Sequence, residues 1–458
     1  SGSRGKGNLS SEANPYFLFP QIYNFRYNIF SSEWPVANRV IELYLQKKSE
    51  NGGWERQING ISNNEKAVLL LEKRTFKELL VDMELRNLQN NIVGQEASRL
   101  FARAEINMGV EAFRDSLYSL LKRNTFLNIK FENMLDTLGE ISRTDIRSLL
   151  GEWEKTTPLP FYSLGEPTLT KITNKGGEEF FVLKMLISNN SDYDGIIHMD
   201  IRKDGWWYQP LEDPRAKTKI EMPAHTSKEF VSVWEDQIRN VEINTMVSGN
   251  LPNIISQDIN NVKQERNKIV KDSIYILPES SFDLPGEIIV DNEDSTLFIL
   301  SAPPIVGLLP KWLDEVEETP FKYSGISWWR PPLQWTATTN DRYYGKYIRS
   351  AFVIKSGDGS QTATWKVPVP EVGQYDLYYH VFKDDELRWN NNLQGEYHFK
   401  VKYGSEVEDA YVNLRKANEG WEQLGSYYFD SDTIRVVLTD ECKLRSVTAD
   451  AVKIVKRY

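Results

Sequence analysis

Few residues in this sequence could carry chemistry, and none forms a recognised catalytic pattern. The four histidines are His198, His225, His380 and His398. No two lie three to five residues apart and no H-E-x-x-H is present, which argues against a zinc hydrolase site within this chain. The motifs of serine hydrolases, P-loop proteins and dinucleotide-binding proteins are also missing. We therefore predict no catalytic residue and no activity in this chain alone, and a structural role for each histidine.

Catalytic carboxylates are harder to exclude from sequence, because a glycosidase or lyase can take its acid and its base from distant strands. Two acidic groups stand out, Asp384-Asp385-Glu386 and the set Glu406, Glu408 and Asp409. We interpret both as solvated charge. Asp291, Glu293 and Asp294 are weak calcium candidates, since calcium prefers oxygen ligands. Their spacing is not that of a dedicated calcium loop, and a hydrogen-bonded turn is the favoured alternative. No other cofactor is indicated.

Aromatic residues are unusually abundant, with 13 Trp, 22 Tyr and 20 Phe, and they are dense in the last third of the chain. Such rings stack on sugars, but they also fill β-sandwich cores. The aromatic residues in predicted turns and loops are the better candidates for binding a ligand, and arginines beside them could pair with sugar carboxylates. These candidates are Trp328, Trp329, Trp335, Tyr343, Tyr344 and Trp389, with Arg330, Arg342 and Arg388.

Charge and composition limit the classes of molecule that this chain could bind. The formal net charge is -10, which argues against nucleic acid, and an anionic sugar polymer would need a local basic patch. The single cysteine, Cys442, cannot form an internal disulfide and is expected to be half-buried near a strand end. No apolar run of membrane-spanning length and no signal peptide is visible. The polar, Gly-rich start is typical of a tail, a linker or a cloning scar, consistent with a fragment of a longer protein.

Apolar spacing of three and four residues predicts a helical bundle over residues 1–160. Ser32 is the expected N-cap of its first helix, with Pro35 in the first turn. A second helix is expected to start at Ser62-Asn63-Asn64-Glu65, and a last one after Thr144-Asp145. The Pro-rich stretch 157–160 ends the pattern.

After residue 160 the apolar period changes to that of short strands separated by turn residues. We predict an immunoglobulin-like β-sandwich over 161–250, a linker over 251–286, and a jelly-roll-like β-sandwich over 287–458. Within the linker, the polar and charged stretch from Gln257 to Lys271 is interpreted as a linker or an exposed helix. The fold class is thus multi-domain α + β. Within the last domain we expect Trp365, Tyr375 and Trp421 to be core residues. Asp450 is expected to accept hydrogen bonds from backbone N–H groups rather than to act in catalysis.

Several pieces of residues 287–458 resemble, in order, the golvesin C-terminal-like domain, also seen as the carbohydrate-binding-type domain of xanthan lyases. The pieces are 289–294, Tyr344-Gly345, Ser350-Ala351, Gly359, Ala363, Trp365, 368–370, 373–376, Gly420-Trp421, 424–429 and 447–453. The resemblance implies a β-sandwich that binds glycans.

A weaker resemblance links residues 15–250 to the C-terminal part of gluzincin aminopeptidases fused to membrane transporter subunits. It is carried by 31–35, 61–67, the helical run to Leu121, and 153–160 with the following strands. No position matches the zinc motif of that family, so no catalytic residue carries over. The resemblance implies an upstream peptidase or membrane domain as a partner.

Together these observations favour a non-catalytic protein or fragment of the cell envelope, periplasmic or at the cell surface, with a carbohydrate-binding C-terminal module. Its partner would be a polysaccharide or a cell-wall glycan. The alternatives are the C-terminal part of a membrane-associated zinc aminopeptidase-like protein, a xanthan-type polysaccharide lyase, and a spacer whose aromatic residues only join domains.

Overall fold

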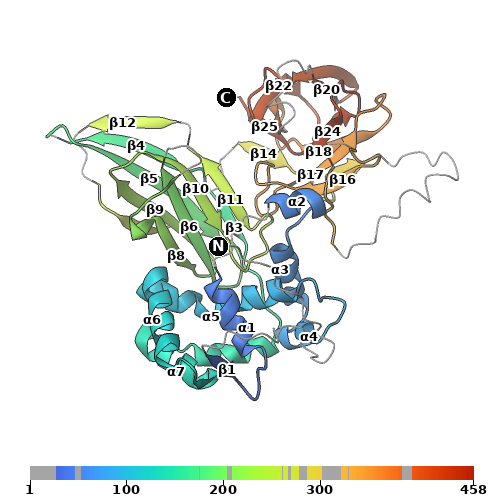
Figure 1. Cartoon of the computed structure of the whole chain (residues 1–458). Helices are drawn as coiled ribbons and strands as arrows, with labels where there is room; N and C mark the ends of the chain where they lie inside the picture. The colour runs from blue at the N-terminus through green and yellow to red at the C-terminus, as the bar shows by residue number, and fades with distance from the viewer. Residues whose placement is uncertain are drawn as a thin grey trace. The chain divides into compact units, whose positions relative to one another are not determined.

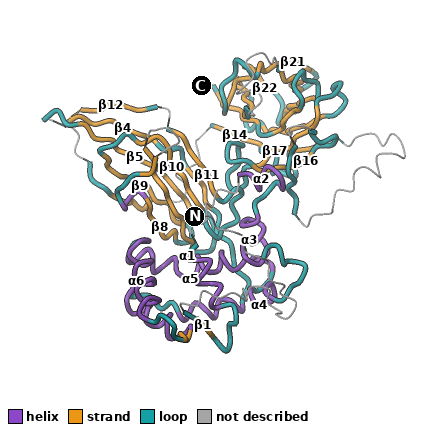
Figure 2. The backbone as a smooth tube through the Cα atoms, in the orientation of Figure 1, coloured by secondary structure: helices purple, strands orange, loops and turns teal. Residues whose placement is uncertain are grey.

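The computed structural model describes residues 27–46, 53–174, 176–203, 209–259, 261–266, 270–277, 286–301, 321–327, 330–383 and 395–457. The chain forms two compact units (Figure 1). The first comprises Ser1–Asn51 and Asn63–Phe282, and the second comprises Gly52–Ser62 and Asp283–Tyr458. Helices dominate the described residues before 155 and strands those after 161, so the predicted α + β class is confirmed (Figure 2). Among the described helices none is long and apolar enough to cross a membrane.

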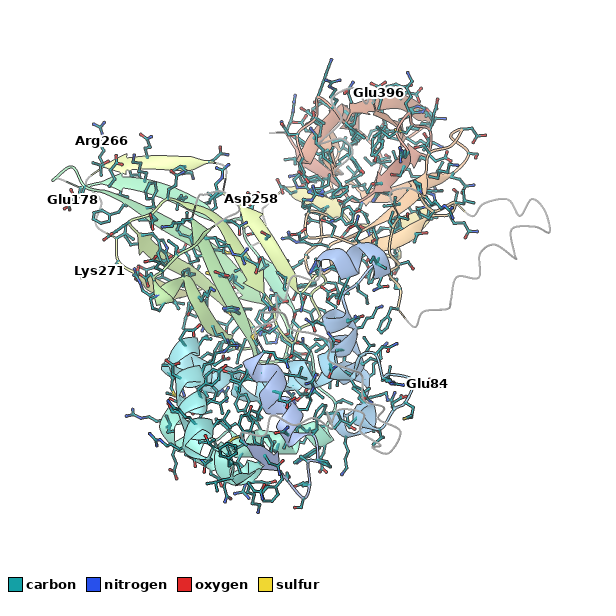
Figure 3. The ribbon with its side chains drawn as sticks, in the orientation of Figure 1. Glu84, Glu178, Asp258, Arg266, Lys271 and Glu396 are labelled. Carbon is teal, nitrogen blue, oxygen red and sulfur yellow. The ribbon has the colours of Figure 1, made fainter. Side chains whose placement is uncertain are left out.

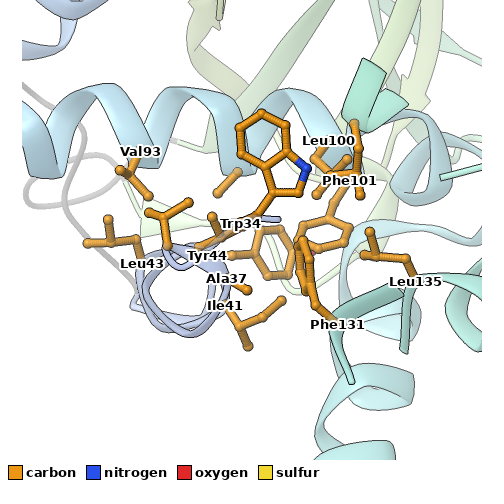
Figure 4. Packing of buried hydrophobic residues seen from close by; sticks show 14 of the residues in the cluster. Trp34, Ala37, Ile41, Leu43, Tyr44, Val93, Leu100, Phe101, Phe131 and Leu135 are labelled. Carbon is orange, nitrogen blue, oxygen red and sulfur yellow. The ribbon is translucent and has the colours of Figure 1, made fainter. Parts of the chain in front are cut away.

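The first unit begins with helices that pack around an aromatic core. They are α1 (Ala37–Leu45), α3 (Asn63–Lys73), α4 (Phe76–Leu80), α5 (Gln89–Met108), α6 (Val110–Arg123), α7 (Phe131–Ser142) and the 3-10 helix η1 (Arg147–Glu154), with the parallel pair β1 (Asn28–Phe30) and β2 (Asn128–Lys130). Trp153 packs edge-on against Trp34 at 5.0 Å and against Phe76 at 4.9 Å between ring centroids. Figure 4 shows Trp34 and Tyr44 from the α1 region converging with Phe101. Large rings thus join helices that are distant in sequence.

The helix starts follow the sequence signals only in part. Helix α3 begins at Asn63, as predicted. Helix α1 begins at Ala37 with Val36 at its N-cap position, so the prediction of Ser32 as N-cap was wrong. Ser31 is the residue whose Oγ accepts from the backbone N–H of Trp34, at 3.0 Å, while donating to the Glu132 carboxylate at 2.5 Å. Ser31 and Ser32 are equivalent capping candidates in the sequence. The hydrogen bond to Glu132 on α7 holds Ser31 in the position that accepts from the Trp34 backbone.

The second part of this unit is a pair of sheets that share an apolar core. One sheet has the order β11-β10-β6-β7, with β8 paired to β6, and the other has the order β12-β4-β5-β9-β13, with β3 paired to β5. The strands are β3 (Tyr162–Leu164), β4 (Thr168–Thr173), β5 (Glu179–Asn189), β6 (Gly195–Lys203), β7 (Gln209–Pro210), β8 (Lys217–Met222), β9 (Thr226–Trp234), β10 (Ile238–Asn244), β11 (Ile254–Asp258), β12 (Val262–Arg266) and β13 (Ser273–Leu277).

Residues 254–258, 262–266 and 273–277 are strands, so the predicted linker over 251–286, with a linker or exposed helix from Gln257 to Lys271, was wrong for these residues. Strands β11, β12 and β13 all lie at sheet edges. Edge strands tolerate charged side chains because one side of the backbone faces solvent. Figure 3 labels Asp258 on β11, Arg266 on β12 and Lys271 just before β13, which lie at different edges of the two sheets. The polar residues of these strands resemble those of a linker in the sequence, although the backbone is hydrogen-bonded to a neighbouring strand.

The second unit contains three sheets whose buried residues form one core. Their orders are β14-β25-β19-β22, β15-β18-β23-β20-β21 and β16-β17-β24. The strands are β14 (Glu287–Val290), β15 (Phe298–Leu300), β16 (Thr336–Thr339), β17 (Ser350–Lys355), β18 (Thr362–Pro368), β19 (Gly373–Val381), β20 (Glu396–Tyr403), β21 (Glu406–Asn413), β22 (Gly420–Phe429), β23 (Thr433–Thr439), β24 (Ser446–Ala449) and β25 (Val452–Lys456). Trp365 and Tyr375 are buried in the core, as predicted, and Cys442 is half-buried next to it.

A short segment from the helical region also belongs to this unit, namely helix α2 (Gly53–Asn59) and the residues up to Ser62. The Thr339 hydroxyl donates to the Gly60 carbonyl at 2.6 Å. A Cβ atom at Gly325 would lie 1.8 Å from the Ile58 carbonyl oxygen, so only glycine allows this approach of the two backbones. The segment thus contacts a strand far along the chain, since Thr339 follows Gly60 by 279 positions.

Candidate functional site

Five residues with aromatic or ionisable side chains lie close together in the second unit. We call them the Asp450 cluster: Tyr344, His380, Trp421, Asp450 and Lys453. Three of them lie on neighbouring strands of the β14-β25-β19-β22 sheet. His380 on β19 pairs with Trp421 on β22, and Lys453 on β25 pairs with Tyr378 on β19. Strand alternation buries Tyr379 and Val452 and turns their neighbours to the outer side of the sheet.

Asp450 lies between β24 and β25 and is fully buried. Its carboxylate accepts from the backbone N–H of Tyr344 at 3.1 Å, which confirms the predicted role of satisfying a backbone donor. The same carboxylate binds Nδ1 of His380 at 2.9 Å. Burial raises the pKa of Asp450, while the neighbouring His380 and the Tyr344 N–H oppose that rise. The contact fixes the imidazole, because one ring nitrogen is held and the other is directed away from Asp450.

The three rings of the cluster form a compact group. The Trp421 ring centroid lies 5.1 Å from that of Tyr344 and 5.1 Å from that of His380. Tyr344 and His380 are 5.8 Å apart. All three residues are half-buried. Within the described part of the chain, the Tyr344 hydroxyl, His380 Nε2 and Trp421 Nε1 make no hydrogen bond. The group therefore combines aromatic surface with three polar atoms that are not used internally.

Lys453 closes one side of the group. Its ammonium lies 4.9 Å from the centre of the Trp421 ring and 5.4 Å from that of Tyr378. It also pairs with the Glu287 carboxylate at 3.2 Å. A lysine held over two rings and against a carboxylate keeps a fixed position and supplies further N–H donors.

The surroundings of the rings are acidic. The pKa of Asp291 is raised well above its usual range, first by burial and then by the charges of Asp450, Glu293 and Asp294. The pKa of the Tyr344 phenol is also raised, by burial and by Asp291 and Asp450. Lys453 directly contacts the Trp421 ring and pairs with Glu287, and Arg349 lies close enough to Asp450 to lower the pKa of that carboxyl. A carboxylate brought to this site would add to this group of acidic side chains.

Within the described residues, no protein nucleophile contacts the histidine of the cluster. A histidine held by a buried aspartate can serve as a general base for a protein nucleophile, a water molecule or a substrate at its other ring nitrogen. Nε2 of His380 contacts no such group among the described residues. Nor do the described histidine, cysteine, aspartate and glutamate side chains form any group of three or more suited to a metal ion.

The candidate calcium ligands form a hydrogen-bonded turn. The Asp294 carboxylate accepts from the Asp291 backbone N–H at 2.9 Å. The Glu293 carboxylate accepts from the Tyr323 hydroxyl at 3.1 Å, pairs with Lys322 at 2.6 Å and is bonded by Ser350. These oxygens are already committed within the protein.

Other sequence candidates are placed apart from the cluster or outside the described residues. Trp328, Trp329, Arg388, Trp389 and Asp384-Asp385-Glu386 lie outside the described residues. Trp335 packs partly against the core and Tyr343 is buried against Phe382, so both serve packing. Arg342 stacks on Phe382 at 4.6 Å and donates to the Lys383 carbonyl, whereas Arg330 is exposed. Tyr344 joins the cluster.

Four cluster residues were missed as candidates. Trp421 was predicted to be core, but it is half-buried and absent from the core cluster, so that prediction was wrong. His380 and Asp450 are 70 positions apart, and no local motif links them. Side chains alternate along β19, so Tyr378 and His380 face away from the side on which Tyr379 is buried. This alternation was the sequence signal that His380 faces outward. The acidic set at 406–409 lies on the exposed strand β21.

Comparison with known proteins identifies this region. Residues 331–456 match the family model of the Golvesin C-terminal domain, which confirms the resemblance seen in sequence. The weaker resemblance to the aminopeptidases is not supported. No curated protein matches the chain.

Solved structures add little. A β-glucuronidase from Bacteroides uniformis is 10% identical, covering 66% of this chain and 30% of its own, with a TM-score of 0.18. A second, Bacteroides uniformis β-glucuronidase 2 covalently bound to cyclophellitol-6-carboxylate aziridine, is 12% identical over 76% and 38%, with a TM-score of 0.19. The Sulfolobus turreted icosahedral virus structure is 11% identical over 67% and 97%, with a TM-score of 0.14. This chain thus spans about a third of those enzymes, and such TM-scores carry no inference.

Proposed function

We propose, from the premise that residues 331–456 are a Golvesin C-terminal domain, that this chain is a non-catalytic glycan-binding protein whose sugar site is the Asp450 cluster. The observation that carries the proposal is the group of three half-buried rings with unused polar atoms, all within the matched residues. Sugars present C–H groups on one side of the ring and hydroxyls at the rim. Aromatic surface beside fixed donors and acceptors matches both.

The charges around the rings favour an uncharged or amino sugar. Asp291, Asp450 and Glu287 lie near Tyr344, and each acts to raise the pKa of its phenol. A uronate carboxylate at the same place would meet like charge, while a hydroxyl or an ammonium group would not. The site thus selects its ligand partly by repulsion.

Binding of neutral, amino and uronate oligosaccharides to the full chain, measured by calorimetry, tests this proposal. Removing the indole with Trp421→Ala should weaken binding about 30-fold, since about 80 Å² of lost stacking surface corresponds to about 2 kcal/mol. The matched control is Tyr428→Ala, which removes a ring that is 59% exposed further along the same strand β22. Equal affinities for all three proteins, or a preference for uronates that depends on Trp421, would refute the assignment.

A glycan-binding module acts where polysaccharide is accessible. We therefore also propose a periplasmic or cell-surface location. Fractionation of cells that express the full-length protein, with an antibody against this chain, checks it, and recovery in the cytoplasmic fraction alone would contradict it.

A further inference from the structure

A second feature lies on the other large sheet of the same unit, β15-β18-β23-β20-β21. Its outer side carries three cations at directly paired positions, which we call the basic row: Lys366, Arg435 and Lys402. Lys366 on β18 pairs with Arg435 on β23, and Arg435 pairs with Lys402 on β20. Because adjacent strands are about 4.8 Å apart, the row crosses three strands over about 10 Å.

The three side chains point away from the core. Their strand neighbours Trp365, Val436 and Val401 are buried, and side chains alternate between the two sides of a strand. Arg435 and Lys402 are exposed, and Lys366 is half-buried. None of the three forms an ion pair with any described residue.

Placing like charges opposite one another across a sheet is destabilising. Lys400 adds a fourth cation two residues from Lys402, and the strand register places Asp409 opposite it. Asp409 instead binds Nε2 of His398 at 2.7 Å. Among the described residues, a row of cations without ion pairs is therefore concentrated on one sheet of a chain with a net charge of -10. Folding does not explain it, whereas an anionic ligand would.

An aromatic pair lies on the same side of the sheet, with its histidine bound to the carboxylates of Asp409 and Glu441. The rings of His398 and Tyr411 stack with centroids 4.8 Å apart and an interplanar angle of 7°. Tyr411 is 56% exposed on the edge strand β21. Both residues lie on the outer side of the sheet. His398 lies on β20, four residues before Lys402. The sheet thus offers cations and a flat ring on one surface.

We propose that this surface binds a carboxylate-bearing polysaccharide, with uronate groups on the basic row and a sugar ring on Tyr411. Charge complementarity carries the choice of occupant. A nucleic acid is disfavoured because its binding needs about 6–10 phosphate contacts, and this chain is acidic overall. The proposal does not depend on the Asp450 cluster, which lies on a different sheet and has the opposite charge character.

The test is titration of the full chain with oligogalacturonate at several salt concentrations. The fully methyl-esterified oligomer serves as the uncharged ligand control. The combined variant Lys366→Gln, Arg435→Gln and Lys402→Gln should bind oligogalacturonate about tenfold more weakly or worse. It should also lose most of the salt dependence of binding. Tyr411→Ala should weaken binding without changing the salt dependence.

The matched control carries the same charge change at exposed cations elsewhere, with Lys346→Gln, Arg415→Gln and Lys416→Gln. It should bind as the unmodified chain does, and so should Trp421→Ala. The basic-row variant should unfold at an equal or higher temperature, since repulsion across the strands is removed. Unchanged binding in that variant, an equal loss in the control, or equal affinity for single-stranded DNA would overturn the proposal.

Discussion

The histidine buried in the first unit provides a quantitative test through the pH dependence of stability. His198 lies on β6, opposite Lys219 on β8, and its Nε2 atom is buried with no hydrogen-bond partner among the described residues. Burial, together with Lys219, Lys217 and Arg114, lowers the pKa of His198 from 6.5 to about 4, while Asp200 opposes this shift. The folded unit therefore resists protonation of this imidazole.

The sign and the size of the effect follow from that shift. Below pH 6.5 the unfolded chain takes up a proton that folded His198 does not, so stability falls as pH decreases from about 6.5 to about 4. Between pH 7 and pH 5 the loss from this single group is about 2 kcal/mol. His198→Asn should abolish that part of the pH dependence, because asparagine does not titrate.

The assay is urea unfolding at pH 7 and pH 5, with the first unit followed by hydrogen exchange of β6 and β8. The control is His225→Asn, which replaces a histidine with a 53% exposed side chain in the same unit and at a positive φ that asparagine tolerates. With only four histidines, their ring signals can also be titrated directly by NMR. A His198 signal that titrates near 6.5, or variants with the same pH dependence as the unmodified chain, would refute the reasoning.

Two further changes test the packing of the units. Gly325→Ala should destabilise the second unit by about 3 kcal/mol, since the new Cβ would overlap the Ile58 backbone. The control is Gly94→Ala, which should stabilise its helix slightly because no atom lies within 4 Å of the new Cβ. Thermal unfolding of the two variants compares these effects. Similar melting temperatures for the two variants would contradict the packing of the segment 52–62. Thr75→Ala should cost about 1 kcal/mol by removing the capping box with Glu78 at the start of α4, measured by urea unfolding. Thr137→Ala on an exposed turn of α7 is its control, and an equal loss there would argue against the cap.

Local patterns were sufficient wherever a residue's role depends on its neighbours in sequence. The change from helical to strand period near residue 160, the start of α3 at Asn63 and the burial of Trp365 and Tyr375 all follow from such patterns. The golvesin resemblance belongs to the same class, because its pieces are short and keep their order. Strands β11, β12 and β13 were not predicted because edge strands do not need the apolar alternation that marks central strands.

The binding surfaces could not be read in the same way. The Asp450 contact with His380 joins residues 70 positions apart, and strand register places Trp421 opposite His380. Likewise, Lys366, Arg435 and Lys402 are isolated charges in sequence, and pairing alone aligns them. The sequence by itself determined the helical first part, most of the later strands, core residues such as Trp365 and the golvesin resemblance of the last domain, since these depend on composition and short-range patterns. Only the tertiary structure decided which charges and rings meet, because long-range pairing has no local signature.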